Sequence, residues 1–405
     1  MKILSLTLCI ILASLLFVTP VLACNPPYLP RVTNVKIGDI VASSNPIDLL
    51  SAQAIAQIAL EDINSYCTRL RIPYRFQVEI KVANGNTAIH LTKVQEFYSQ
   101  GVRLLLAGRW SNQAKTSLSY INANKMLMLS PSATVPDLAI AGDNLFRLCP
   151  SDSYLGPALA NTVWSKGVKH VIVIQRGDSW GDGLYSTFIS EYTRLGGSLA
   201  SEVIRYATTE VDFTTHLATA ESQATEAGSE YGVVLLAFNE AATILNTLAN
   251  NQNLYQKIYS CIWFGADGTA NNQYIIDNAG AAAAHVGLYS LRAKEVHGPS
   301  WSSVESRYQA ATGQIFNSYI AYEYDIFWVY ALSVVKTGST NTVAVKCVLP
   351  WVAARYNGAS GYCKLNAYGD RLNPGFDIWS YVKIDGPVQA SLSGSVDTNN
   401  VVKWY

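Results

Sequence analysis

Short apolar runs of strand length alternate with longer amphipathic stretches from Asn34 onward. The first predicted elements are a strand over 35–41, a helix over 49–65 and a strand over 77–82, and the pattern continues to a fourth strand over 126–129. This alternation is typical of a mostly parallel sheet covered by helices, because each parallel strand needs a crossover connection. We therefore predict an α/β fold.

The alternation occurs twice along the chain. A second series begins near residue 155, with predicted strands over 170–175, 199–204, 232–237 and 258–264. The chain has 405 residues, which is more than one hydrophobic core usually organises. We therefore expect two lobes, each built on a parallel-rich sheet.

Polar or aromatic residues follow the predicted strands. The strand over 126–129 runs into Ser130-Pro131-Ser132-Ala133-Thr134, where a proline among small hydroxyl residues disfavours a helix. Ligands of open α/β sheets bind at the carboxyl ends of the strands, so two lobes that face each other by these edges would enclose a cleft. Hydroxyl and free amide groups suit a carboxylate or a zwitterion, and an ordinary capped turn is the alternative.

Charge and ligand spacing exclude several classes of partner. The 29 basic and 29 acidic residues balance and form no long block, which argues against nucleic acid or an anionic membrane surface. No two cysteines have CxxC spacing and the five histidines are scattered, so we expect no metal site. We recognise no nucleophile with a positioned base and no phosphate loop, and we expect neither a cofactor nor enzymatic activity.

The N-terminal segment is typical of a signal peptide over 1–23. Lys2 precedes an apolar run that starts at Leu4, and Ala23 stands before Cys24. We therefore expect an exported protein, periplasmic or extracellular. Cys24 is either lipidated, which would be the protein's attachment to a membrane, or a free cysteine that can form a disulfide.

Export makes disulfides chemically reasonable. Cys347 and Cys363 are the best candidate pair, because Gly358 and Gly361 between them allow the chain to turn back.

Several short motifs occur in an order that is similar to that of a known family. They are Lys36-Ile37-Gly38, Gln100-Gly101-Val102, Ala107-Gly108, Met128 to Thr134, Ser179-Trp180-Gly181-Asp182-Gly183, Ala266-Asp267-Gly268, Tyr322-Glu323-Tyr324-Asp325 and Gly369-Asp370-Arg371. From Asn34 to Ile384 the chain resembles type I periplasmic binding proteins, specifically the branched-chain amino acid (Leu/Ile/Val) binding proteins and their amide- and urea-binding relatives.

The resemblance implies two Rossmann-like lobes joined by a hinge of three crossovers. The first lobe is expected over 34–151 plus 290–373, and the second over 152–289 plus 374–405. Members of the family trap a small molecule between the lobes and deliver it to the permease of an ABC transporter. They are not enzymes.

The resemblance also implies a carboxylate site on the first lobe. The family places a ligand-binding serine at Ser111, or at Asn112 because the alignment is ambiguous by one residue. Ser132 and Thr134, with Ala133 between them, match positions that meet the carboxylate and amino groups of the ligand. A plain helix N-cap is the alternative for Ser111.

On the second lobe the family places aromatic residues at Trp180 and Phe238 that cover the ligand. Asp267 matches the acidic residue that holds the ligand's ammonium group. A carboxylate in a closed cleft is costly unless it is paired, which agrees with a zwitterionic ligand. A turn aspartate that caps its own loop is the alternative.

Arg109 and Trp110 depart from the smaller residues of the family. An arginine beside the carboxylate site would favour a second acidic group or a larger anion on the ligand, since guanidinium binds oxyanions in bidentate fashion. An arginine that is paired within the protein is the alternative.

The sequence therefore predicts a solute-binding protein that captures a branched-chain-like amino acid, or a related small zwitterion, for an ABC importer. The alternatives are a sensory ligand-binding module and an amide- or urea-binding protein, both of which would use the same cleft.

Overall fold

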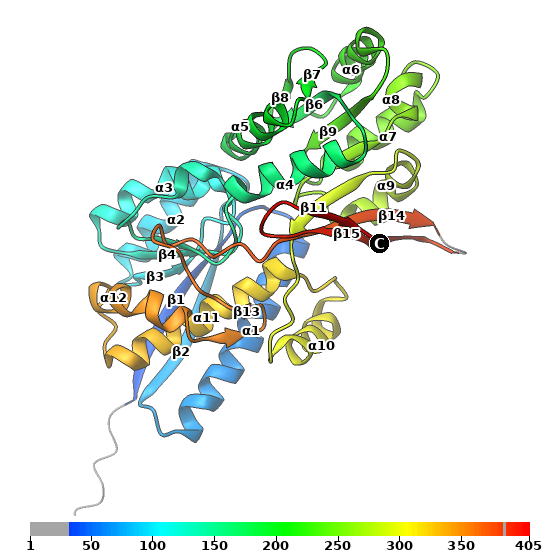
Figure 1. Ribbon diagram of the computed structural model, residues 1–405. Coiled ribbons are helices and arrows are strands. Elements are labelled where there is room, and N and C mark those ends of the chain that lie inside the picture. The colour runs from blue at the N-terminus through cyan, green and yellow to red at the C-terminus, as the bar shows by residue number, and fades with distance from the viewer. Residues whose placement is uncertain (1–31, 384–385) are drawn as a thin grey trace, which may run out of the picture.

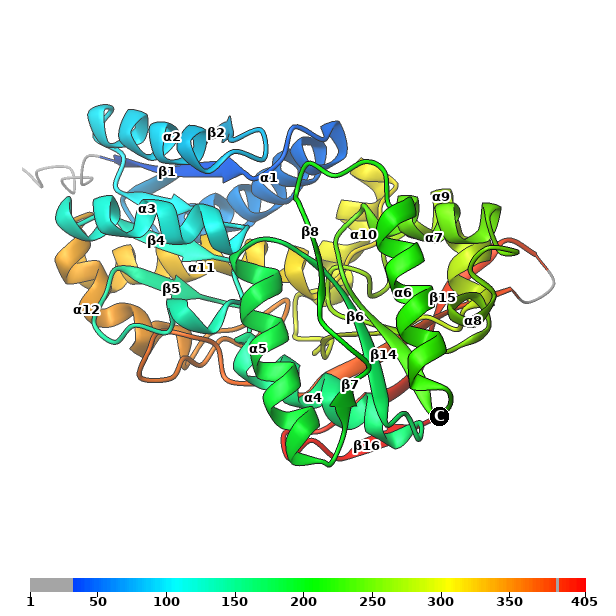
Figure 2. The same ribbon diagram turned by 90° about the horizontal axis from the view of Figure 1, so that it is seen from above.

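The computed structural model describes residues 32–383 and 386–405. The predicted signal peptide over 1–23 and Cys24 lie outside these residues. Two α/β bodies lie side by side, each with a central sheet and covering helices (Figures 1 and 2). We call the body that contains the first sheet the first lobe, and the other the second lobe.

The sheet of the first lobe is entirely parallel, with strand order β2-β1-β3-β4-β5. Its strands are β1 (Thr33–Val41), β2 (Tyr74–Val82), β3 (Leu104–Leu106), β4 (Leu127–Ser130) and β5 (Leu145–Arg147). Its helices are α1 (Pro46–Arg69), α2 (Thr87–Ser99), α3 (Ser111–Ala123), α10 (Trp301–Thr312), α11 (Ser318–Thr337) and α12 (Thr342–Ala353), with a single turn, η1 (Pro136–Leu138).

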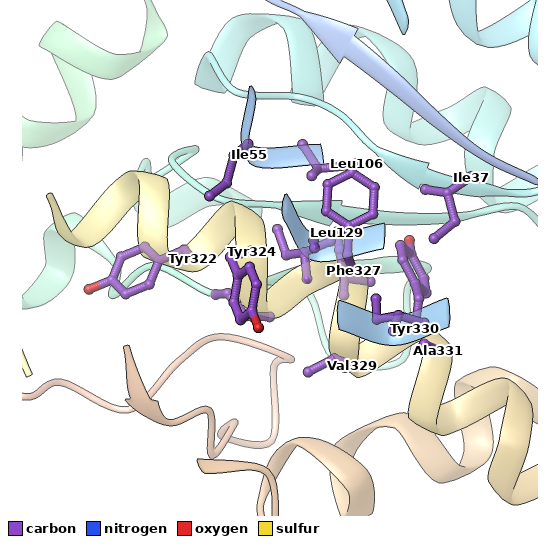
Figure 3. Close-up of a cluster of buried hydrophobic side chains, with 14 of the residues drawn as sticks. Ile37, Ile55, Leu106, Leu129, Tyr322, Tyr324, Phe327, Val329, Tyr330 and Ala331 are labelled. Carbon is purple, nitrogen blue, oxygen red and sulfur yellow. The ribbon is translucent and has the colours of Figure 1, made fainter. Parts of the chain in front are cut away.

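Helix α11 packs in the core of the first lobe, against its sheet. The side chain of Asn317 caps its first turn, and Gly338 ends it in the left-handed conformation, at φ +63°. Phe327 and Tyr330 pack against Ile37 and Leu129 of the sheet (Figure 3). The Tyr330 hydroxyl reaches the carbonyl oxygen of Leu105, at 2.9 Å, so even the polar atom of this buried ring is satisfied.

The second lobe has a mixed sheet. Its order is β16-β15-β14-β11-β10-β9-β6-β7, with β8 also paired to β6, and the part from β11 to β7 is parallel. The strands are β6 (His170–Arg176), β7 (Ser198–Leu199), β8 (Ile204–Tyr206), β9 (Tyr231–Leu236), β10 (Trp263–Gly265), β11 (Tyr289–Ala293), β14 (Phe376–Lys383), β15 (Val388–Val396) and β16 (Val402–Trp404). The helices are α4 (Asp152–Ser165), α5 (Ser179–Arg194), α6 (Thr214–Ala227), α7 (Ala241–Asn250), α8 (Gln256–Ser260) and α9 (Gln273–His285).

Two predicted strands differ from those in the structure. The strand predicted over 199–204 is two short strands, β7 and β8. The strand predicted over 258–264 starts late, because residues 258–260 end helix α8. Ile258 is buried there and its carbonyl accepts a 2.7 Å hydrogen bond from Trp263 Nε1, so an apolar run that looks continuous is divided between a helix and a strand.

Three connections join the sheets: from β5 to α4, from β11 to α10, and into β14 from the hairpin of β12 (Asn357–Gly358) and β13 (Gly361–Tyr362). Arg147 at the end of β5 forms a bidentate ion pair with Asp370 of the third connection, at 2.6 and 2.7 Å. The Lys294 amide of the second connection donates to the Gly375 carbonyl of the third. The predicted lobe boundary at 290 falls inside β11, and the second sheet keeps residues up to Ala293.

Cys347 and Cys363 carry free thiols, so the predicted disulfide between them is wrong. The chain does turn back through Gly358 and Gly361, which face each other in the β12–β13 hairpin. The hairpin buries Cys363 against Asp325 of α11, whereas Cys347 is exposed on α12.

Candidate functional site

A cavity of about 550 Å³ lies between the lobes and is lined by residues of both. Seven of the ten predicted ligand-binding residues line it: Arg109, Trp110, Ser111, Ser132, Trp180, Phe238 and Asp267. They lie in the loops, or in the first turns of the helices, that follow β3, β4, β6, β9 and β10. The cavity therefore lies where an open α/β sheet binds its ligands, at the carboxyl ends of the strands.

The other three predicted residues, Asn112, Ala133 and Thr134, do not line the cavity. The Thr134 hydroxyl donates a 2.8 Å hydrogen bond to Asp152 Oδ2. Ala133 is fully buried, and its carbonyl accepts a 3.0 Å hydrogen bond from Arg147. Both residues stabilise the loop behind the cavity wall.

Hydrogen bonds from serine hydroxyls to backbone carbonyls join the end of β4 and the loop after it to the loop after β3 in the first lobe. The Ser132 hydroxyl donates to the Arg109 carbonyl at 2.8 Å, and the Ser130 hydroxyl donates to the Gly108 carbonyl at 2.8 Å. Gly108 has φ +67°, and a Cβ added there would lie 2.8 Å from Ala114 Cβ, so the tight passage from β3 to α3 requires glycine. Ser111 then begins α3 at the cavity wall.

The guanidinium of Arg109 is committed to partners within the first lobe. It contacts Glu323 at 2.9 Å through Nε and through one terminal nitrogen, and Asp39 at 2.5 and 3.3 Å. The Ile40 carbonyl accepts a further bond at 2.7 Å. These five contacts equal the five N–H groups of an arginine, so none is left for a ligand oxyanion. The internally paired arginine, rather than the ligand-binding one, is what the structure contains.

Burial of this ion cluster affects the pKa of Asp39. Asp39 is fully buried, and burial raises its pKa to about 6, although the positive charge of Arg109 acts in the opposite direction. The cluster therefore needs the arginine to keep Asp39 ionised at neutral pH.

An aromatic group crosses the cleft. The ring centroids of Trp180 and Phe238 are 4.5 Å apart in the second lobe, and Trp110 of the first lobe lies 5.9 Å from Phe238. The Asp178 side chain caps α5 by accepting hydrogen bonds from the backbone amides of Trp180 and Gly181, which fixes the backbone that carries the Trp180 side chain. Part of the cavity wall is therefore an apolar surface that both lobes contribute.

Asp267 follows β10 and lines the cavity as a half-buried carboxylate. The Tyr319 hydroxyl of α11 donates to its Oδ2 at 2.5 Å. Its Oδ1 is also buried and has no hydrogen-bond partner among the described residues. Burial raises the pKa of Asp267, and the hydrogen bond from Tyr319 lowers it in part.

The family follows from a comparison with known proteins. A family model described as the receptor family ligand binding region matches residues 52–384. The chain belongs to this family. A curated relative of this receptor-family chain, an uncharacterised protein of Methanocaldococcus jannaschii, is 28% identical over 366 residues, which are 85% of this chain and 86% of that protein.

Solved structures agree on the fold of this receptor-family chain, which is that of type I periplasmic binding proteins. A leucine binding protein from Thermotoga maritima has a TM-score of 0.74 and 18% identity, covering 91% of this chain and 100% of that one. A branched-chain amino acid transporter substrate binding protein from Streptococcus pneumoniae, solved with isoleucine, has a TM-score of 0.73 and 18% identity, covering 89% and 100%. An ABC-transporter solute binding protein from R. palustris, solved with benzoate, has a TM-score of 0.73 and 15% identity, covering 89% and 96%.

Sequence reasoning missed three polar residues of the site. Tyr319 and Arg292 line the cavity, and Asp152 lies behind it. Burial raises the pKa of Asp152 well above its ordinary value, and the charge of Asp267 raises it further. In the sequence Asp152 looks like an ordinary first-turn acid after the capping Ser151, so no local signal marks it.

Two classes of feature are absent from the described part of this receptor-family chain. Within residues 32–383 and 386–405, no helix combines the length and apolar composition needed to cross a bilayer. The same residues contain no group of three or more His, Cys, Asp and Glu side chains arranged to hold a metal ion.

Proposed function

We propose that this protein captures an amino acid, or a related small zwitterion, between its lobes and delivers it to the permease of an ABC importer. The observation that carries the proposal is Asp267, a half-buried carboxylate at the cavity wall whose Oδ1 atom is buried and unpartnered among the described residues. A buried carboxylate is costly unless a positive group pairs with it. The ammonium group of an amino acid supplies that partner.

The carboxylate of the ligand binds on the first lobe in this proposal. Ser111 and Ser132 line the same cavity, and Ser111 begins α3 with no side-chain cap on its first turn. The first N–H groups of a helix lack intrahelical partners and attract negative charge. The two ends of a zwitterion therefore bind to different lobes, Trp180 and Phe238 cover its side chain, and binding favours closure.

The proposal is tested by calorimetric titration with a panel of amino acids, amides and urea. Asp267→Asn removes the charge and keeps the shape, and we expect it to weaken binding at least about tenfold, because hydrogen bonds to charged groups are worth about 1.5–3 kcal/mol. Asp277→Asn is the matched control, since Asp277 also lines the cavity but is exposed. Equal affinity of wild type and Asp267→Asn would refute the ammonium site.

Sensing is the second candidate function, and the description of the matched family as a receptor ligand-binding region favours it. It uses the same cleft. The neighbouring genes distinguish the two functions. Genes for a permease and an ATPase beside this one would support transport, whereas a gene for a sensor kinase would support signalling.

A further inference from the structure

Arg292 is a buried arginine in the cavity wall, and the proposed sites for the ligand's ammonium and carboxylate groups do not use it. It lies at the end of β11 and is 3% exposed. Its two terminal nitrogens donate to the Ala270 carbonyl at 2.9 Å and to Glu295 Oε1 at 2.8 Å. Its Nε–H is buried and has no partner in the part of the chain that the structure describes.

The sheet register places Arg292 beside Asp267. Gly265 of β10 pairs with Ser290 of β11 in a parallel ladder, and Asp267 and Arg292 each lie two residues further along. Both therefore lie at the same carboxyl edge of the sheet. No ion pair joins them among the described residues, and each keeps an unpartnered polar atom.

Unpartnered donors in a cavity wall imply an acceptor that completes them. Buried polar groups are nearly always hydrogen-bonded, and a buried donor left unpaired costs free energy. The same wall contains a second such donor, the indole Nε1–H of Trp180. Both donors are already buried, and the side chain of a purely aliphatic ligand would leave both without an acceptor.

We infer that Arg292 determines the specificity of the cleft by donating its Nε–H to an oxygen acceptor on the ligand's side chain. This inference rests on the proposed function. It assigns the ligand to amino acids whose side chain ends in a carboxamide or a carboxylate, and away from leucine, isoleucine and valine. Arg292 thereby takes the role that the sequence suggested for Arg109, which its internal ion pairs exclude.

The charges around Arg292 predict which of the two side-chain groups, carboxamide or carboxylate, binds more tightly. Glu295 already neutralises the guanidinium through the 2.8 Å ion pair. A neutral carboxamide adds no further negative charge beside Asp267 and Glu295, whereas a carboxylate does. We expect glutamine and asparagine to bind more tightly than glutamate and aspartate.

The test is calorimetric titration of the wild-type protein and of Arg292→Lys with glutamine, glutamate and leucine. Lysine keeps a positive charge near Glu295 but lacks the planar guanidinium group and its Nε–H donor. We expect the wild type to bind glutamine or glutamate at least about tenfold more tightly than leucine, and Arg292→Lys to lose most of that ratio while its affinity for leucine changes by less than about threefold.

Any one of four outcomes overturns the inference. Leucine that binds wild type as tightly as both polar ligands overturns it, whether or not Arg292→Lys folds. An equal weakening of all three ligands in Arg292→Lys shows a purely structural arginine. If no amino acid binds the wild type, the proposed function is refuted together with the inference. If the wild type prefers leucine and Asp267→Asn abolishes leucine binding, only the inference about Arg292 is refuted.

Discussion

The hydroxyl of Tyr319, on α11 of the first lobe, donates a 2.5 Å hydrogen bond to Oδ2 of Asp267 in the second lobe. This bond crosses the cleft and therefore exists only while the lobes are close. It also orients the carboxylate that we propose as the ammonium site. Closure and ligand recognition thus share one side chain.

Removing this bond should make ligand binding more sensitive to acid. Burial raises the pKa of Asp267 and the Tyr319 bond lowers it in part, so Tyr319→Phe should raise that pKa further. Because an ammonium group needs the ionised carboxylate, affinity should fall as the pH falls through the raised pKa, and this loss should begin at a higher pH in the variant. At neutral pH we expect at least about tenfold weaker binding.

Calorimetry between pH 4 and pH 8 checks this prediction. Tyr274→Phe is the control, since Tyr274 lines the cavity but is exposed. Superimposable pH profiles for wild type and Tyr319→Phe would contradict it.

Arg109 should matter for stability because two buried carboxylates depend on it. Arg109→Met leaves Asp39 and Glu323 without their partner, and breaking a buried ion pair from one side costs roughly 3–5 kcal/mol. Urea denaturation measures this loss. Lys115→Met removes the exposed ion pair with Asp137 and should cost less than about 1 kcal/mol. A similar small loss in both variants would contradict the assignment.

Asp152 should destabilise the ligand-free protein at neutral pH. Burial raises its pKa, so its favourable contribution is complete below the unfolded-state pKa of about 3.9 and is lost as the pH rises through the folded-state pKa. Asp152→Asn avoids that loss and retains an acceptor for Thr134. The variant should therefore melt at a higher temperature than wild type at pH 8, and its free energy of unfolding should exceed that of wild type by more than the about 0.5 kcal/mol typical of surface substitutions.

Thermal melts at pH 4 and pH 8 test this sign. The gap between Asp152→Asn and wild type should widen with rising pH. Asp137→Asn, at an exposed position, should show no such trend. A gap that is independent of pH would exclude buried charge as its cause.

Most helices and strands of the fold can be predicted from the sequence, because the periodicities of helices and strands are local patterns. The run 170–175, for example, is β6, which ends at Arg176. The run 258–264 misleads for the same reason, since apolar residues alone do not distinguish the end of a helix from the start of a strand. Tertiary packing divides it after Ser260.

The resemblance to type I periplasmic binding proteins indicated the cavity residues Ser111, Ser132, Trp180 and Asp267. They lie around one cavity because parallel strands bring their carboxyl ends to one edge of each sheet. The sequence by itself thus determined the α/β class and seven of the residues that line the cavity. Only the tertiary structure decided which charges are free. Arg109 pairs with Asp39 and Glu323, which are 70 and 214 residues away in the sequence. Tyr319 donates to Asp267, which is 52 residues away in the sequence. Burial and pairing depend on such non-local contacts, which no local pattern encodes.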